Sequence, residues 1–165
     1  MVYAYYHRLN RRQKGIYRQS ERVEAVSLND NGALIPLARD LATALETENQ
    51  KETTRICRLL VTGICEDLQI RNTRIKVLAR RPSNNWGELH GLYEPGSRMS
   101  SARITVWMRT AQRKQVVAFK TFLRTVLHEL CHHLDYELLK LEDSFHTEGF
   151  FKRESSIYKQ LVQQK

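Results

Sequence analysis

The sequence has little of what marks several common classes of protein. Its three cysteines include no Cys-x-x-Cys pair, so we expect reduced thiols rather than a disulfide framework. No apolar run approaches the roughly 20 residues of a membrane-spanning helix, and the N-terminus lacks the apolar stretch and cleavage site of a secretory signal. There is no repeat or low-complexity tract, and seven glycines and three prolines exclude a collagen-like chain. We therefore expect a cytoplasmic protein with no membrane association.

What is present indicates an ordinary globular domain. Hydrophobic residues make up 41% and charged residues 27% of the 165 positions, which is enough to build a core and excludes intrinsic disorder. We divide the chain into a basic N-terminal arm, residues 1–32, and a single domain, residues 33–165.

The formal net charge of +9 is concentrated in two segments. Residues 1–22 carry six basic groups against one acidic group, and residues 73–125 carry eleven against two. A polyanion such as DNA would explain this through phosphate contacts, and a solvated basic surface is the alternative. The arm interleaves its charges with tyrosines, so it is either a binding arm or a terminal helix that packs its tyrosines on the domain.

The hydrophobic periodicity predicts the α+β class, with N-terminal helices, a small antiparallel sheet, and then two more helices. Asn49 and Glu52 have the spacing of an N-cap and its capping-box partner. The last strand comes directly before the long helix, and we expect it to be an edge to which an extended substrate can add. The expected elements are helices over 34–45, from 49 to 68, over 116–141 and from 147 onward, and strands over 74–80, 87–93 and 103–109.

The most informative motif is His128-Glu129-Leu130-Cys131-His132, an HExxH pattern on a predicted helix. Histidines four residues apart lie one helical turn apart on the same face, so both imidazoles can reach one Zn²⁺ ion. Glu129 can then accept a proton from zinc-bound water. On a helical projection the apolar residues cluster on one broad face, and His128 and His132 lie on the opposite side.

A catalytic zinc ion usually has three protein ligands and one open position. His146 follows an acidic turn that would bring the chain back toward the helix, and we expect it to be the third ligand. Glu154 is the rival, either as a ligand in a His-His-Glu site or as a partner of a ligand histidine. Glu148 is a weaker candidate that better suits the first turn of a helix.

The neighbours of the motif have other expected roles. Asp135 lies nearly two turns beyond His128, so we expect it to orient His132 rather than to bind metal. His133 lies toward the apolar flank and should be a packed, hydrogen-bonded histidine. Cys57 and Cys65 border the apolar face of their helix and should be packing residues, while Cys131 points away from the ligands.

These residues together resemble the SprT/Spartan-like zinc metalloproteases. The resemblance covers roughly residues 56–158. It is carried by Gly91-Leu92-Tyr93, by Ile104-Thr105-Val106, by the HExxH motif, and by His146 with the aromatic Phe150 four residues later. It implies a zincin-like fold and hydrolysis of protein substrates, which in the best-known members are attached to DNA.

The sequence thus predicts a zinc metallopeptidase in which His128, His132 and His146 bind Zn²⁺ and Glu129 activates water. The expected partner is a protein or peptide substrate, with DNA contacts through segments 1–22 and 73–125. One alternative is a nucleic-acid-binding module whose zinc site is structural or vestigial. Another is a cytoplasmic regulatory peptidase of the His-His-Glu type.

Overall fold

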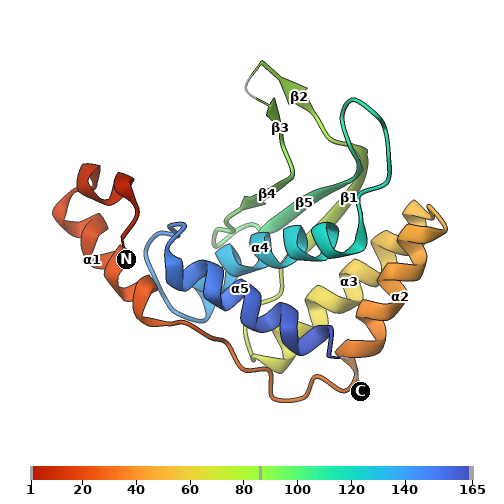
Figure 1. The fold of residues 1–165 in the computed structure, drawn as a ribbon. Helices are drawn as coiled ribbons and strands as arrows, with labels where there is room; N and C mark the ends of the chain where they lie inside the picture. Colours follow the sequence, from red (N-terminus) through yellow and green to blue (C-terminus); the bar gives the residue numbers. More distant parts are fainter. Residues whose placement is uncertain (1, 86, 164–165) are drawn as a thin grey trace.

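The computed structural model describes residues 2–85 and 87–163, and it confirms the α+β class (Figure 1). In chain order, the elements are η1 (Ala4–Arg8), α1 (Arg11–Arg22), α2 (Leu34–Glu46), α3 (Gln50–Asp67), β1 (Arg74–Arg80), β2 (Ser83–Asn84), β3 (Gly87–Glu88), β4 (Gly91–Glu94), β5 (Arg103–Arg109), α4 (Phe119–Glu137) and α5 (Glu148–Leu161). Here η1 is a short 3-10 helix.

The main sheet is mixed, so the prediction of an antiparallel sheet is wrong. Its strand order is β1-β5-β4, with β5 parallel to β1 and antiparallel to β4. The chain leaves β1, forms the small β2–β3 hairpin and returns through β4, so β5 runs in the same direction as β1. Apolar alternation identifies a strand but carries no information about its direction, which the connection decides.

Two further strand predictions are corrected. The expected strand over 87–93 is two strands, β3 and β4, which belong to different sheets. The expected edge strand over 103–109 is β5, which lies in the centre of its sheet, and β4 is the edge beside it. The central position fits the composition of β5, because Ile104 to Met108 are all buried, whereas β4 has no fully buried residue.

Helix α4 lies between the sheet and α5 and also contacts α2 (Figure 1). The core joins all of these layers through side chains that are completely buried, among them Leu41, Leu60, Ile104, Leu123 and Phe150. Helix α4 is shorter than the predicted span of 116–141. Val116 forms a β-bridge with Arg109 before the helix begins. Ala118, whose backbone is extended, is the N-cap of α4.

Local capping explains two of the helix starts. The Asn49 side chain accepts a hydrogen bond from the Glu52 backbone N–H at 3.0 Å, which confirms the predicted N-cap of α3. A reciprocal capping box occurs instead at α1, between Asn10 and Gln13. In the basic N-terminal arm, Tyr17 is completely buried and Tyr6 nearly so. This burial agrees with the second alternative above, a terminal helix that packs its tyrosines on the domain.

Candidate metal centre

Two of the predicted ligands lie on one side of α4. Leu127 and Leu130 point into the core with no exposed surface, while His128 and His132 are half-buried on the opposite side of the helix. Their ring centroids are 5.2 Å apart, as one helical turn requires. The predicted separation of a core face from a histidine face is therefore present in the fold.

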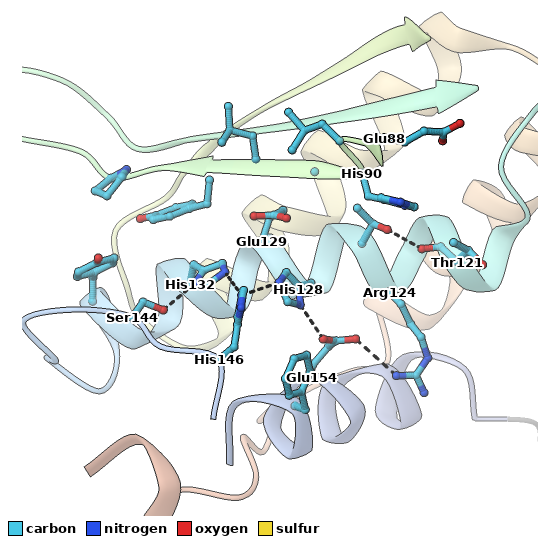
Figure 2. Close-up of a pocket in the computed structure, with 18 residues that line it drawn as sticks. Glu88, His90, Thr121, Arg124, His128, Glu129, His132, Ser144, His146 and Glu154 are labelled. Atoms are coloured by element: carbon cyan, nitrogen blue, oxygen red, sulfur yellow. Dashed lines mark hydrogen bonds and ion pairs between the residues drawn. The ribbon is translucent and has the colours of Figure 1, made fainter. Parts of the chain in front are cut away.

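His146 reaches the same place from the loop between α4 and α5. Lys140 has a φ of 55°, which turns the chain back after α4 ends. Thr147 then begins α5 as its N-cap, accepting a hydrogen bond from the Phe150 backbone N–H at 2.9 Å. The Nε2 atom of His146 lies 3.0 Å from Nε2 of His128 and 3.0 Å from Nε2 of His132 (Figure 2).

Hydrogen bonds on the far side of the rings assign the tautomers of two of these histidines. His128 Nδ1 donates to the Glu154 carboxylate at 3.1 Å. Ser144 Oγ donates to the Asp135 carboxylate at 2.7 Å, so it accepts from His132 Nδ1, also at 2.7 Å. In its neutral form each ring then carries its proton on Nδ1 and presents an unprotonated Nε2 to the centre of the cluster.

This arrangement fits a metal ion, and His128, His132 and His146 could hold one. If His146 Nε2 carries a proton, it can donate a hydrogen bond to Nε2 of His128 or to Nε2 of His132, but not to both. The other histidine then keeps an Nε2 lone pair without a donor in the cluster, and a bound cation would satisfy it. Ligand nitrogens on a tetrahedral zinc ion lie about 3.3 Å apart, close to the observed 3.0 Å. Imidazole nitrogen is also a preferred zinc ligand.

The ionisation of the cluster favours binding of a cation. Burial, together with the neighbouring imidazoles of His128 and His146, lowers the pKa of His132 to about 3. Burial and the neighbouring His128 also lower the pKa of His146. Both rings are therefore neutral at neutral pH, and a metal ion need not displace protons from them.

The aromatic ring of Phe150 forms an apolar floor beneath the three imidazoles. It is completely buried, and its centroid lies 5.0, 4.7 and 5.2 Å from those of His128, His132 and His146. The spacing of four residues between His146 and Phe150, noted in the sequence, thus brings one turn of α5 under the cluster.

Glu129 lies on the same helix but points between α4 and β4 (Figure 2). It is 7% exposed, and burial raises the pKa of its carboxyl group against the opposing effect of His128. The backbone of Gly91 passes directly over it. A Cβ atom at Gly91 would lie 2.6 Å from Glu129 Oε1 and 2.9 Å from its Cγ.

The histidine cluster and Glu129 open into one cleft of about 830 Å³. Strand β4 forms one wall, α4 the floor and the start of α5 the other wall (Figure 2). Exposed apolar side chains line it, namely Leu89, Leu92 and Phe151. A large apolar cleft with a few convergent polar groups is typical of a substrate-binding site.

The remaining candidate carboxylates have other partners in the structure. Glu154 is engaged with His128 and with Arg124, 3.6 Å away, and lies outside the histidine cluster. Glu148 is in the first turn of α5 and pairs with Lys152 at 3.3 Å. The predicted orienting role of Asp135 is present, although it acts through Ser144.

Two predictions about buried side chains are confirmed. His133 is fully buried, with hydrogen bonds to the Tyr93 hydroxyl at 2.9 Å and to the Arg71 carbonyl at 2.6 Å. Cys57 and Cys65 are free and buried, as expected of packing residues, and Cys131 is free and buried as well.

Several residues contribute to the site in ways that could not be assigned from the sequence. Ser144 is an unremarkable loop serine until the fold brings it between Asp135 and His132. Tyr5 donates a hydrogen bond to the His146 carbonyl across 141 positions of sequence. The need for glycine at position 91 likewise arises only when β4 crosses α4.

The basic residues do not gather in the cleft. One cluster of four arginines surrounds a separate hollow at the start of β1 and β5, formed by Arg71, Arg74, Arg98 and Arg103. Arg103 pairs with Glu94 at 2.8 Å. Among the described residues, neither Arg74 nor Arg98 forms an ion pair.

Comparison of this chain with protein-family models, with curated proteins and with solved structures finds no match. Within residues 2–85 and 87–163, no helix has the length and apolar character needed to cross a membrane. The function is therefore argued below from the site itself.

Proposed function

We propose that this chain is a zincin-like, zinc-dependent metallopeptidase that hydrolyses protein substrates. The observation that carries the proposal is the convergence of three Nε2 atoms, from His128, His132 and His146, at the floor of a cleft that also contains Glu129. Three protein ligands leave an open coordination position, whereas structural zinc sites are closed by four.

The contacts in the cleft suggest one role for the three histidines and another for Glu129. His128, His132 and His146 would hold the ion, and zinc bound there would supply Lewis acidity toward a water molecule and the scissile carbonyl. Glu129 accepts a proton from the attacking water and returns it to the leaving amine, so the peptide bond breaks while one water is consumed. The raised pKa of the Glu129 carboxyl group makes it a stronger base than an exposed glutamate.

Strand β4 is the element best suited to hold the substrate. It is the edge of its sheet and forms a wall of the cleft, so an extended peptide can pair with its free backbone groups while lying above α4. The apolar side chains of Leu89, Leu92 and Phe151 favour a substrate with hydrophobic residues near the scissile bond.

Elemental analysis combined with a protease assay tests this proposal. We expect about one zinc ion per wild-type chain and a clear loss of zinc in His146→Ala. Glu129→Gln should retain zinc while turnover of an unfolded, fluorophore-labelled protein falls at least 100-fold. Unchanged zinc content in His146→Ala would instead move the third ligand to Glu154 or Glu148, as in a His-His-Glu site.

Nucleic-acid binding is a second candidate function, and the hollow lined by Arg71, Arg74, Arg98 and Arg103 favours it. Guanidinium groups that lack an ion pair are free to contact phosphates. The expected result is duplex DNA binding that weakens steeply with salt, with a shallower salt dependence in the Arg74→Ala/Arg98→Ala double variant. Binding without any proteolysis would favour the nucleic-acid module with a structural zinc site.

A further inference from the structure

The three imidazoles of the candidate centre are supported in different ways. His128 and His132 are fixed by α4, and each has a hydrogen-bond partner on its outer nitrogen, Glu154 and Ser144 respectively. His146 comes from a loop and is exposed. Its ring contacts only the other two histidines and the neighbouring aromatic side chains, among the interactions of the described residues.

The backbone of His146 is held instead by residues 3–24, the N-terminal segment. The Tyr5 hydroxyl donates a hydrogen bond to the His146 carbonyl oxygen at 2.6 Å. Tyr5 is in turn fixed by Tyr17, whose ring lies edge-on at 5.7 Å and is completely buried.

The same segment holds the loop on both sides of His146. Before it, Arg12 pairs with Glu142 at 2.6 Å. After it, Ser20 Oγ bonds Thr147 Oγ1 at 2.9 Å in a buried position, and the Glu21 carboxylate accepts from the Gly149 backbone N–H at 2.8 Å. Figure 1 shows η1 and α1 beside this loop, at the end of the molecule where α4 and α5 are joined.

We propose that the N-terminal segment, residues 3–24, is a built-in part of the metal centre, and that Tyr5 is the positioning residue of the third ligand, His146. The inference rests on the metal site of the proposed function and assigns the N-terminal segment to retention of the metal. A flexible ligand loop must lose conformational entropy when the ion binds, and contacts that order the loop beforehand remove part of that cost. Tyr5 positions His146 through its backbone carbonyl. Glu154 and Ser144 position the rings of His128 and His132 through their Nδ1 atoms.

The test compares Tyr5→Phe with Tyr6→Phe. Both changes remove one hydroxyl from the same short helix, but the Tyr6 hydroxyl is buried without a hydrogen-bond partner among the described residues, so Tyr6→Phe is the matched control. The zinc dissociation constant is measured by competition with a chromophoric chelator, and the melting temperature is measured on the metal-free proteins. Loss of an outer-shell partner typically weakens metal binding 10- to 100-fold, and we expect about tenfold for Tyr5→Phe and less than twofold for Tyr6→Phe.

A spectroscopic readout separates positioning from general stability. Cobalt substituted into the site should show an altered visible absorption in Tyr5→Phe and an unchanged spectrum in Tyr6→Phe, while the metal-free melting temperatures of the two variants agree. Equal zinc affinity in the two variants would overturn the proposal. So would a loss of affinity in Tyr5→Phe that is matched by an equal loss of stability in the metal-free protein, because Tyr5 would then serve the fold alone.

Failure of the inference is distinguishable from failure of the proposed function. If the wild type binds no zinc, the metallopeptidase proposal fails, and hydrogen exchange of the metal-free loop still tests the role of Tyr5. Backbone amides between residues 141 and 147 should then exchange faster in Tyr5→Phe than in Tyr6→Phe. Identical exchange in the two variants would show that Tyr5 does not order the loop.

Discussion

Gly91 is the residue at which β4 and Glu129, the proposed general base, approach most closely. An alanine there would place its Cβ 2.6 Å from Glu129 Oε1 and 2.9 Å from both Glu129 Cγ and Thr125 Cγ2, which is closer than such atoms can pack. Glu129 must then move out of place, and a displacement of about 1 Å can cost roughly 100-fold in rate. We expect Gly91→Ala to keep its zinc while kcat/KM for a protein substrate falls between tenfold and 100-fold.

Gly15→Ala is the matched control for this prediction, because nothing lies within 4 Å of the Cβ that it adds to α1. Proteolysis by the control should equal that of wild type. Full activity in Gly91→Ala would mean that the position of Glu129 beneath β4 has no bearing on turnover.

Ser144 links the buried ion pair of Asp135 and Arg153 to His132, one of the proposed metal ligands. Asp135 and Arg153 are both completely buried, 2.9 Å apart, and Ser144 connects Asp135 to His132 through two bonds of 2.7 Å. Ser144→Ala removes the acceptor for His132 Nδ1, so we expect the zinc dissociation constant to rise about tenfold. Isothermal titration of the metal-free protein measures this, with the exposed loop variant Ser101→Ala as control. An affinity equal to that of the control would refute the link.

At the scale of elements, α1 and α5 pack so closely that only glycine fits at position 149. A Cβ there would lie 2.5 Å from the Ser20 carbonyl oxygen and 2.8 Å from that of Glu21, both of them backbone atoms that cannot rotate away. Overpacking of this kind costs about 1–3 kcal/mol. We expect Gly149→Ala to lower the free energy of unfolding, measured in urea, by that amount.

The comparison variant is again Gly15→Ala, which should gain up to about 1 kcal/mol from the better helix propensity of alanine. If Gly149→Ala unfolds at the wild-type urea concentration, α1 and α5 must separate without cost. The N-terminal segment could not then hold the loop as we propose.

The helices could be predicted from the sequence because their signals are local. The apolar stripe of α2 and the N-cap at Asn49 depend on residues within one or two turns, and both are present in the fold. The sheet could not be predicted to the same extent. Which strand is central depends on pairings between β1 and β5, whose first residues Arg74 and Arg103 are far apart in the sequence.

The same distinction holds for the candidate site. The spacing of His128 and His132 is a property of one helix, and His146 follows one loop later, so the meeting of the three histidines could be predicted. Ser144, Gly91 and Tyr5 act through contacts between different elements. Tyr5 meets His146 from the opposite end of the chain, and no periodicity or motif links the two positions.

On the scale of the whole molecule, the candidate metal centre lies beside the core rather than within it. The buried apolar cluster runs through α2, α3, the main sheet, α4 and α5, and the histidines contact it mainly through Phe150. The core is therefore large enough to fold without metal, in contrast to small zinc domains whose folding depends on the ion.

The expected consequence is a metal-free protein that keeps its far-UV circular dichroism after treatment with a chelator and gains stability when zinc returns. Zinc at 100 times its dissociation constant adds about 2.7 kcal/mol if it binds the folded state alone, which corresponds to a rise of roughly 5–10 °C in Tm for a chain of this size. His146→Ala should show the metal-free Tm with little further rise at the same zinc concentration. Loss of helical signal on chelation would instead mean that the ion holds the fold together, and an equal rise in wild type and His146→Ala would locate the zinc elsewhere on the molecule.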